Sequence, residues 1–227
     1  LGYNSNNGHQ EIVERLENKD IGWAYADQSM FNPKLHNLMS LRKQIIKRPV
    51  ITTVEVLVKP VSSKNDMFFT GFVHKPYPPI YLELSRNAQF NSATVIRGTE
   101  GGIIPSLRQT GKVHFYHSAD EQDDCYDVTP EDLGIVQSSR AVDIPEEISR
   151  KSIKDKIESK VDAVDIAKET IKAGMSALSG YDGPMLSCIQ LGAAIILQRA
   201  TGDDLSNCSK EVLRVLKSGA ALKRMKR

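Results

Sequence analysis

Arg42 is the residue whose type and position most directly suggest chemistry. It lies seven positions after Leu35, so on a helix it falls almost directly above Leu35 and interrupts an apolar stripe. The stripe consists of Leu35, Leu38, Met39, Ile45 and Ile46. A guanidinium on an apolar face must be paired, because desolvating an unpaired charge is costly. Its partner is either a structural carboxylate, which these residues alone favour, or an anionic ligand held in a pocket.

A glycine-rich loop, IRGTEGGIIPSL over residues 96–107, follows an apolar run at 93–96 that predicts a strand. Glycines after a strand let the backbone approach a ligand, and their N–H groups can face an anion. The G-x-x-G-G spacing matches neither the phosphate-binding P-loop nor the dinucleotide fingerprint, and the loop holds a single acid, Glu100. These residues by themselves therefore favour an ordinary tight turn.

Other polar groups form weaker patterns. His74, Lys75 and Tyr77 lie on a proline-rich stretch, where they could stack on a nucleotide and pair with it. A turn with exposed polar tips explains them at least as well. His114 and His117 precede an acidic run, but residues three apart on a strand point to opposite faces. We therefore expect a solvated loop there and no metal site.

Basic residues gather on the candidate helix and at the end of the chain. Lys43, Lys47 and Arg48, with Lys59 farther on, could line a phosphate-binding surface. The same applies to the tail residues Lys223, Arg224, Lys226 and Arg227. The alternative is a solvated helix face and a frayed end, which we favour for the tail. A net charge of +2 and a pI near 8.4 do not indicate nucleic acid without further support.

The elements that must position these groups alternate between strands and helices. Strands are expected at 21–25, 49–58, 93–96 and 111–117, and helices at 9–18, 32–47, from 79, 161–178, from 184 and from 209. This order predicts an α/β fold with a largely parallel sheet flanked by helices. Residues 128–135 read as a loop with a short turn. The helix from Pro184 is apolar nearly all round, so it should be central and buried.

Composition narrows the class of protein. Charged residues make up 26% and hydrophobic residues 40%, which is typical of a soluble globular protein. Three cysteines without a CxxC pair favour a reducing, cytoplasmic compartment over a disulfide framework or a zinc site. No stretch is long and apolar enough to span a membrane, so no membrane association is expected. The opening LGYNSNNG resembles the end of a cut helix, so we expect an N-terminally truncated chain.

Several stretches, taken in order, resemble the C-terminal part of the anthranilate phosphoribosyltransferase family (glycosyltransferase family 3). The segment 32–60 is similar, without gaps, to the family's HPAMK…R…LG.RT.FN.LGPL.NP segment. VIRGTEGG resembles VVHG.DGLDE, VTPEDLGI resembles PEDFGL, and GYDGPMLSCIQLGAAIIL resembles G..GP..D.VLLNAA.AL. KSGAALKRM is similar to the closing SG.A…L. Together these stretches cover nearly the whole chain.

The resemblance implies a nucleoside phosphorylase/phosphoribosyltransferase-type α/β domain over residues 1–227, usually in a homodimer. It also implies that residues of about 30–48 contribute to a small helical subdomain. Arg42 takes the position that grips the carboxylate of the aromatic substrate, which favours the pocket over a structural ion pair. The family's glycine-rich diphosphate loop and KHGN stretch would lie before Leu1.

This chain departs from the family where the chemistry is done. Asn32 replaces the histidine beside the substrate pocket, and Arg97 replaces the histidine before the glycine. The acid pair that binds magnesium in the family aligns with Ile103 and Ile104. Two aliphatic side chains cannot ligate a cation that requires oxygen, so we predict no metal and no cofactor. Loss of acids and gain of Arg97 should make the cleft more positive.

These departures resemble a divergent branch of the family, some of whose members bind nucleic acid. We therefore predict a protein that has lost the family's transferase activity and binds single-stranded or structured nucleic acid in a basic groove. The expected anion pocket consists of Arg42, Asn32, Arg97, Gly98, Thr99, Glu100, Gly101 and Gly102. The nucleic-acid-binding candidates are Lys43, Lys47, Arg48, His74, Lys75 and Tyr77. The alternative is a phosphoribosyltransferase acting on an unidentified aromatic or nitrogen acceptor, which would require magnesium and phosphoribosyl diphosphate.

Overall fold

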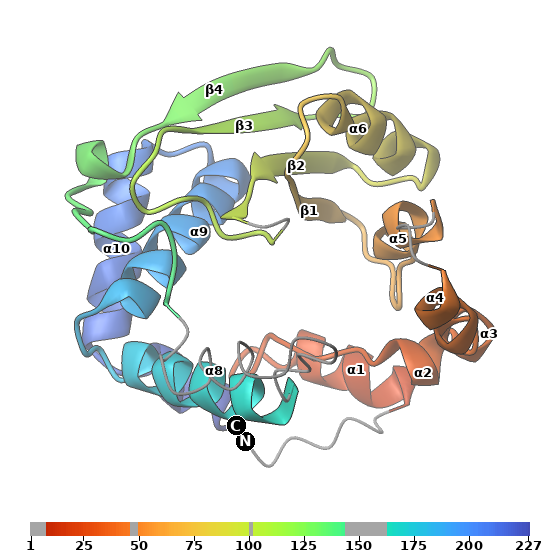
Figure 1. The fold of residues 1–227 in the computed structure, drawn as a ribbon, viewed down its shortest axis with the longest axis horizontal. Coiled ribbons are helices and arrows are strands. Elements are labelled where there is room, and N and C mark those ends of the chain that lie inside the picture. The colour runs from red at the N-terminus through yellow and green to blue at the C-terminus, as the bar shows by residue number, and fades with distance from the viewer. Residues whose placement is uncertain (1–7, 46–49, 100–101, 144–162) are drawn as a thin grey trace. The chain divides into compact units, whose positions relative to one another are not determined.

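The computed structural model describes residues 8–45, 50–99, 102–143 and 163–227 (Figure 1). The chain divides into two compact units. Unit 1 comprises Leu1–Ile96, Val113–Tyr126 and Arg224–Arg227, and unit 2 comprises Arg97–Lys112 and Asp127–Lys223. The predictions made for Lys47, Arg48, Glu100 and Gly101 fall outside the described residues.

Unit 1 begins with short helices. They are α1 (His9–Glu17), α2 (Gln28–Phe31), α3 (Pro33–His36), α4 (Met39–Gln44), α5 (Ile51–Val54) and the 3-10 helix η1 (Glu55–Leu57). The long helix expected from residue 32 is thus divided into α3 and α4. Its predicted start is confirmed, because the Asn32 Oδ1 accepts a hydrogen bond from the Leu35 N–H at 3.2 Å and Pro33 is the first helical residue.

Two strand predictions in unit 1 are wrong. The β-branched segment 50–58 forms α5 and η1, and its N–H groups bond to nearby carbonyls, as from Thr53 to Val50 at 2.8 Å. β-branched residues favour strands only where a neighbouring strand pairs with them. The β-branched composition of this segment therefore does not decide its structure, and local hydrogen bonds make it helical. Residues 21–25 are irregular, and Gly22 has a φ of 64°, which ends any extended run.

A four-stranded sheet has the order β1-β2-β3-β4. Its strands are β1 (Met67–Phe72), β2 (Ser92–Arg97), β3 (Gly111–Tyr116) and β4 (Asp124–Val128), and α6 (Tyr77–Asn87) follows β1. The predicted α/β class, a sheet flanked by helices, is confirmed, as are β2, β3 and the helix before β2. The sequence did not indicate β4, whose residues are mostly exposed and polar, as is typical of an edge strand. It did not indicate β1 either.

The pairing of β2 with β3 is antiparallel, with Ala93 opposite Tyr116 and Ile96 opposite Val113. This pair departs from the largely parallel sheet that we predicted. Parallel neighbours need a long crossover, usually a helix. The described residues between β2 and β3 contain no α-helix and instead form the glycine-rich loop. The strand–helix alternation that favours parallel pairing is therefore interrupted at this point of the chain.

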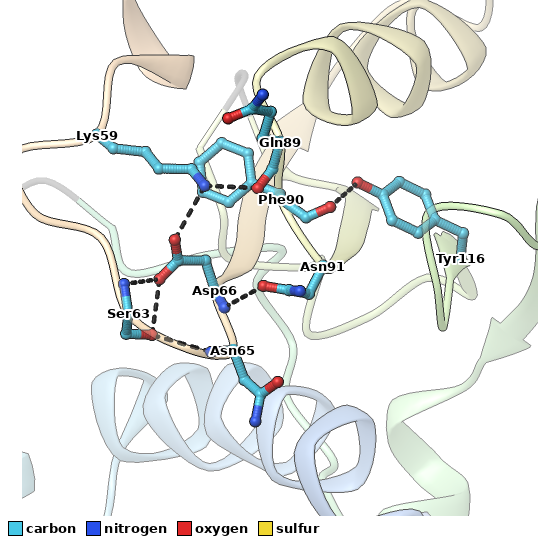
Figure 2. A network of polar contacts seen from close by, with 8 residues as sticks. All are labelled: Lys59, Ser63, Asn65, Asp66, Gln89, Phe90, Asn91 and Tyr116. Carbon is cyan, nitrogen blue, oxygen red and sulfur yellow. Dashed lines mark hydrogen bonds and ion pairs between the residues drawn. The ribbon is translucent and has the colours of Figure 1, made fainter.

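A polar network fixes the ends of β1, α6 and β2 in unit 1 (Figure 2). The Lys59 Nζ donates to the Asp66 Oδ2 at 2.9 Å and to the Gln89 carbonyl at 2.7 Å. The Asp66 N–H donates to the Asn91 Oδ1 at 2.7 Å. Beside it, the buried Tyr116 hydroxyl donates to the Phe90 carbonyl at 3.1 Å. Lys59, a candidate for a phosphate-binding surface, therefore uses its ammonium group in contacts within the protein.

The helices of unit 2 confirm the predicted helical last third of the chain. They are α8 (Ala163–Leu178), α9 (Pro184–Thr201), α10 (Leu205–Lys217) and the start of α11 (Ala220–Met225), and the 3-10 helix η3 (Pro130–Leu133) precedes them. Along α9, Leu191, Ala194 and Ile195 are fully buried, as predicted for a central helix. The last long helix begins earlier than expected, because Asp204 caps it by accepting from the N–H groups of Ser206 and Asn207.

Within the described residues, no helix has both the length and the hydrophobicity needed to cross a membrane.

Candidate anion-binding site

The glycine-rich loop folds as a tight turn at the end of β2. Gly98 pairs with Pro105 in an antiparallel bridge, and the Thr99 N–H donates to the Ile104 carbonyl at 2.8 Å. The Gly102 N–H donates to the Thr99 carbonyl at 3.1 Å. A Cβ atom on Gly98 would lie 1.5 Å from the Gly102 carbonyl oxygen. Glycine at position 98 is therefore required by the close approach of two backbone segments.

This turn also forms one wall of a pocket in unit 2. The cavity has a volume of about 990 Å³, within the range typical of small-ligand sites. A second wall is the segment 138–143, and Met185 and Cys188 of α9 complete the lining. The described lining residues are Thr99, Gly102, Ile103, Ile104, Arg108, Ser138, Ser139, Arg140, Ala141, Val142, Asp143, Met185 and Cys188. Two of them are cationic, Arg108 and Arg140, and one is anionic, Asp143.

Hydrogen bonds join the two chain segments that carry Arg108 and Arg140. The N–H of Leu107, which is fully buried, donates to the Arg140 carbonyl at 3.0 Å. The Arg108 Nη1 donates to the Ser138 carbonyl at 3.4 Å, and the Ser106 Oγ accepts from the Arg108 N–H at 3.3 Å. Both arginine side chains are nevertheless exposed. The lining therefore includes two arginines, which come from two chain segments joined by hydrogen bonds.

Cys188 lies in the lining of the pocket but does not offer a nucleophile. Its side chain is 1% exposed, and burial raises the pKa of its thiol to about 11, although a backbone hydrogen bond from Val142 opposes the shift. The thiolate is the reactive form of cysteine, so this thiol is neutral and inert near pH 7.

We expect iodoacetamide at pH 8 to label Cys125, which is exposed, and to leave Cys188 and Cys208 unlabelled. Burial raises the pKa of both protected thiols, and for Cys188 the rise to about 11 lowers the thiolate fraction by roughly a hundredfold. Peptide mass spectrometry would identify the labelled positions, and labelling in denaturant should modify all three. Equal labelling rates for Cys125 and Cys188 in the native protein would contradict this assignment.

Arg42 has a carboxylate partner within unit 1. Its Nη1 lies 2.6 Å from the Glu55 Oε2, and the two side chains are 26% and 16% exposed. The Gln28 Nε2 donates to the same oxygen at 3.4 Å. The position of Arg42 on an apolar stripe favours such a structural carboxylate as its partner, whereas the family resemblance favours a ligand. An anionic ligand of Arg42 would have to compete with Glu55 for the guanidinium group.

The structure distributes the other predicted pocket residues between different roles. Asn32 caps α3 in unit 1, and Arg97 is the exposed last residue of β2. Thr99 and Gly102 line the pocket, as do Ile103 and Ile104, whereas Gly98 shapes the turn behind them. No group of three or more His, Cys, Asp or Glu side chains in the described ranges could hold a metal ion.

Three of the predicted nucleic-acid-binding residues form an aromatic surface in unit 1, where β1 is followed by α6. The ring centroids of His74 and Tyr77 lie 6.1 Å apart, and those of Tyr77 and Tyr81 lie 6.0 Å apart. Tyr77 is 36% exposed, and Lys75, which lies between His74 and Tyr77 in the sequence, is exposed as well. Lys43 belongs to α4. The short segment that carries His74, Lys75 and Tyr77 is therefore exposed, and its two rings lie near each other.

Sequence reasoning missed the two arginines of the pocket and the serines beside them. Arg108 follows the glycine-rich loop, and Arg140 ends a Ser-Ser-Arg run, but neither pattern matches a known phosphate motif. The signals that pointed to this place were the predicted pocket residues Thr99 and Gly102, together with Ile103 and Ile104, which stand where the resemblance puts the magnesium-binding acids.

Comparisons with known proteins give a consistent result for the fold. No family model matches the chain. The anthranilate phosphoribosyltransferase of Aquifex aeolicus is 24% identical over 213 residues, which cover 93% of this chain and 56% of that protein. A yeast (Saccharomyces cerevisiae) anthranilate phosphoribosyltransferase, solved in complex with PRPP and Mg, superposes with a TM-score of 0.70 at 16% identity and covers 99% of this chain. This chain is similar to anthranilate phosphoribosyltransferases, and it shares their fold.

A second relative extends the likeness to another bacterium. The anthranilate phosphoribosyltransferase of Novosphingobium aromaticivorans is 24% identical over 139 residues, which cover 61% of this chain and 40% of that protein. An uncharacterised protein of Aquifex aeolicus is 35% identical over 95 residues, which cover 42% of this chain and 30% of that protein. The chain thus spans between 30% and 56% of the length of these curated relatives. The predicted single domain, homodimer and cytoplasmic location stay predictions.

Proposed function

We propose that this phosphoribosyltransferase-like protein binds nucleic acid through the pocket of unit 2, without a divalent metal. The observation that carries the proposal is the charge of the pocket lining. It contains two arginines, Arg108 and Arg140, and a single described acid, Asp143. Guanidinium groups bind phosphate oxygens through paired hydrogen bonds and keep their charge at all physiological pH values.

The described lining offers magnesium one carboxylate, that of Asp143, whereas the family resemblance expects an acid pair. This ion requires near-octahedral coordination by oxygen, supplied in proteins by one or two carboxylates together with substrate phosphates. Ile103 and Ile104 occupy the positions that the family resemblance assigns to the acid pair, and they offer no oxygen on their side chains. In this pocket the two arginines supply the positive charge that a metal ion would otherwise bring to a phosphate.

The aromatic surface of unit 1 supports nucleic acid as the kind of polyanion. Single-stranded nucleic acids are bound where exposed aromatic rings stack on bases and nearby cations hold the backbone. Tyr77 and His74 present such rings, and the exposed Lys75 of the same segment presents the cation. A protein that bound only inorganic polyphosphate would gain nothing from these rings.

Fluorescence anisotropy of a labelled single-stranded oligonucleotide, measured in EDTA over a series of salt concentrations, tests the proposal. Replacing both arginines in R108Q/R140Q should weaken binding by about tenfold or more and lower the slope of log K against log salt by roughly 1.4. K168Q/K172Q on α8 is the matched control, because it removes the same charge from side chains that are 69% and 79% exposed and do not line the pocket. The control should retain the affinity of the unaltered protein.

Three results would refute this function. They are an absence of binding at low salt, binding that requires magnesium, and equal losses in the two double variants. Equal losses would mean that general charge, and not the pocket, governs the affinity.

A second function, transfer of phosphoribose to an aromatic or nitrogen acceptor, is favoured by one observation. A solved structure with which the chain shares its fold, at a TM-score of 0.70, is an enzyme in complex with PRPP and Mg. Isothermal calorimetry of the full protein with phosphoribosyl diphosphate and magnesium tests this alternative. Measurable binding heat is expected if it holds, and the absence of heat would eliminate it.

A further inference from the structure

We infer that the pocket of unit 2 receives a terminal phosphate monoester at the end of a nucleic-acid strand, and not an internal phosphodiester. The inference rests on the proposed function and specifies which part of a strand enters the pocket. Two features of the pocket support it: the positive charge of its lining and the apolar character of one wall.

The described lining of the pocket is cationic, because it holds two arginines and one acid. Arg108 and Arg140 come from segments that are joined by the hydrogen bonds Leu107 N–H to Arg140 O and Arg108 Nη1 to Ser138 O. Both arginines line one cavity, where Asp143 is the single described acid. A phosphate monoester carries between one and a half and two negative charges at pH 7, whereas a phosphodiester carries about one. The monoester thus gains more from a pair of arginines.

Cys188 of α9 also belongs to the lining, and burial keeps its thiol neutral, so this side chain does not repel an entering phosphate.

One wall of the pocket suits the nucleoside that carries the phosphate. Ile103 and Ile104 are 48% and 36% exposed, and Met185 of α9 also lines the cavity. These aliphatic side chains can lie against a sugar and a base while the phosphate reaches the arginines. The combination of an apolar wall with a cationic one matches a terminal nucleotide better than it matches bare phosphate.

Competition anisotropy with three oligonucleotides of one sequence tests this inference. The first carries a 5′ phosphate, the second a 3′ phosphate, and the third has hydroxyl groups at both ends. We expect one phosphorylated strand to bind about tenfold more tightly than the hydroxyl-ended strand. R108Q/R140Q should abolish this preference, and K168Q/K172Q should retain it. Inorganic phosphate and a nucleoside 5′-monophosphate serve as competitors that carry the monoester without a strand.

The outcomes separate this inference from the function on which it rests. Equal, salt-dependent affinities for the three strands would overturn end recognition and leave nucleic-acid binding intact. A mononucleotide that competes as strongly as the phosphorylated strand would also overturn it, because the pocket would then be a site for free nucleotides. Absence of binding for all three strands would overturn both proposals. A preference that survives in R108Q/R140Q would place the terminal phosphate outside this pocket.

Discussion

Substitution of Gly98 by alanine should destabilise the protein by about 3 kcal/mol and weaken ligand binding in the pocket at least tenfold. The added Cβ atom would lie 1.5 Å from the carbonyl oxygen and 2.6 Å from the carbonyl carbon of Gly102. Both are backbone atoms, so no side-chain rotation can relieve the collision. The turn must therefore open, which displaces Thr99, Ile103 and Ile104 from the wall of the pocket.

The same turn provides the matched control. A Cβ atom on Gly102 would lie 3.5 Å from the Thr99 carbonyl oxygen and 3.9 Å from the Ile104 nitrogen, which are ordinary contact distances. The free energy of unfolding of Gly102→Ala should therefore lie within about 0.5 kcal/mol of that of the unaltered protein. Urea denaturation gives the stabilities, and oligonucleotide anisotropy gives the affinities. Similar stabilities for G98A and G102A would show that the backbone of the turn is not packed as described.

Replacement of Asp66 by asparagine should cost about 2–3 kcal/mol of stability at pH 7. The carboxylate accepts hydrogen bonds from the Lys59 Nζ at 2.9 Å and from the N–H and hydroxyl of Ser63 at 2.9 and 2.8 Å. Both members of the Lys59–Asp66 pair are only 15% exposed, so water cannot fully replace the lost carboxylate. The network joins the start of β1 to the residues around Asn91 that precede β2 (Figure 2).

The cost of D66N should depend on pH in a defined direction. Burial raises the pKa of Asp66, but hydrogen bonds from Lys59 and Ser63 outweigh it and bring the pKa below the ordinary value of 3.8. The contribution of this carboxylate is therefore fully present above pH 4 to 5 and is lost as the pH falls through the lowered pKa. Urea denaturation at several pH values should show the difference between the two proteins shrinking below about pH 4.

Asp127→Asn is the control for this second prediction. Its carboxylate pairs with Lys112 at 2.9 Å, but it is 60% exposed, and exposed pairs contribute less than about 1 kcal/mol. A D66N variant that is no less stable than D127N at pH 7 would show that the network does not hold these strand ends. A deficit that stays constant down to pH 2 would contradict the lowered pKa of Asp66.

The two expected partners of Arg42, a structural carboxylate and an anionic ligand, show how far local sequence reasoning extends. Its position on an apolar stripe correctly indicated that the guanidinium group needs a partner. The family resemblance favoured a ligand, whereas the structure gives it the carboxylate of Glu55 at 2.6 Å. Glu55 lies in a segment that the sequence assigned to a strand, and a strand would not have placed this side chain as η1 does. An error in one element thus concealed the partner of a residue in another.

Several features follow from the sequence by itself. The starts of α3 at Pro33 and of α9 at Pro184, the end of α8 before Gly180, and the strands β2 and β3 were all predicted. Caps, prolines and apolar runs act on the backbone within a few residues, so their effects can be read without a fold. Gly180 illustrates this, because its φ of 83° is open to glycine and costly for other residues.

The tertiary structure alone decided which residues share the pocket. Arg108 and Arg140 are far apart in the sequence and match no motif, and a backbone hydrogen bond from Leu107 to Arg140 brings their segments together. It also decided that β2 and β3 pair antiparallel and that residues 50–58 are helical. These outcomes depend on which distant segments can bury each other and satisfy each other's hydrogen bonds. Such pairings are properties of the whole folded chain, and no window of neighbouring residues contains them.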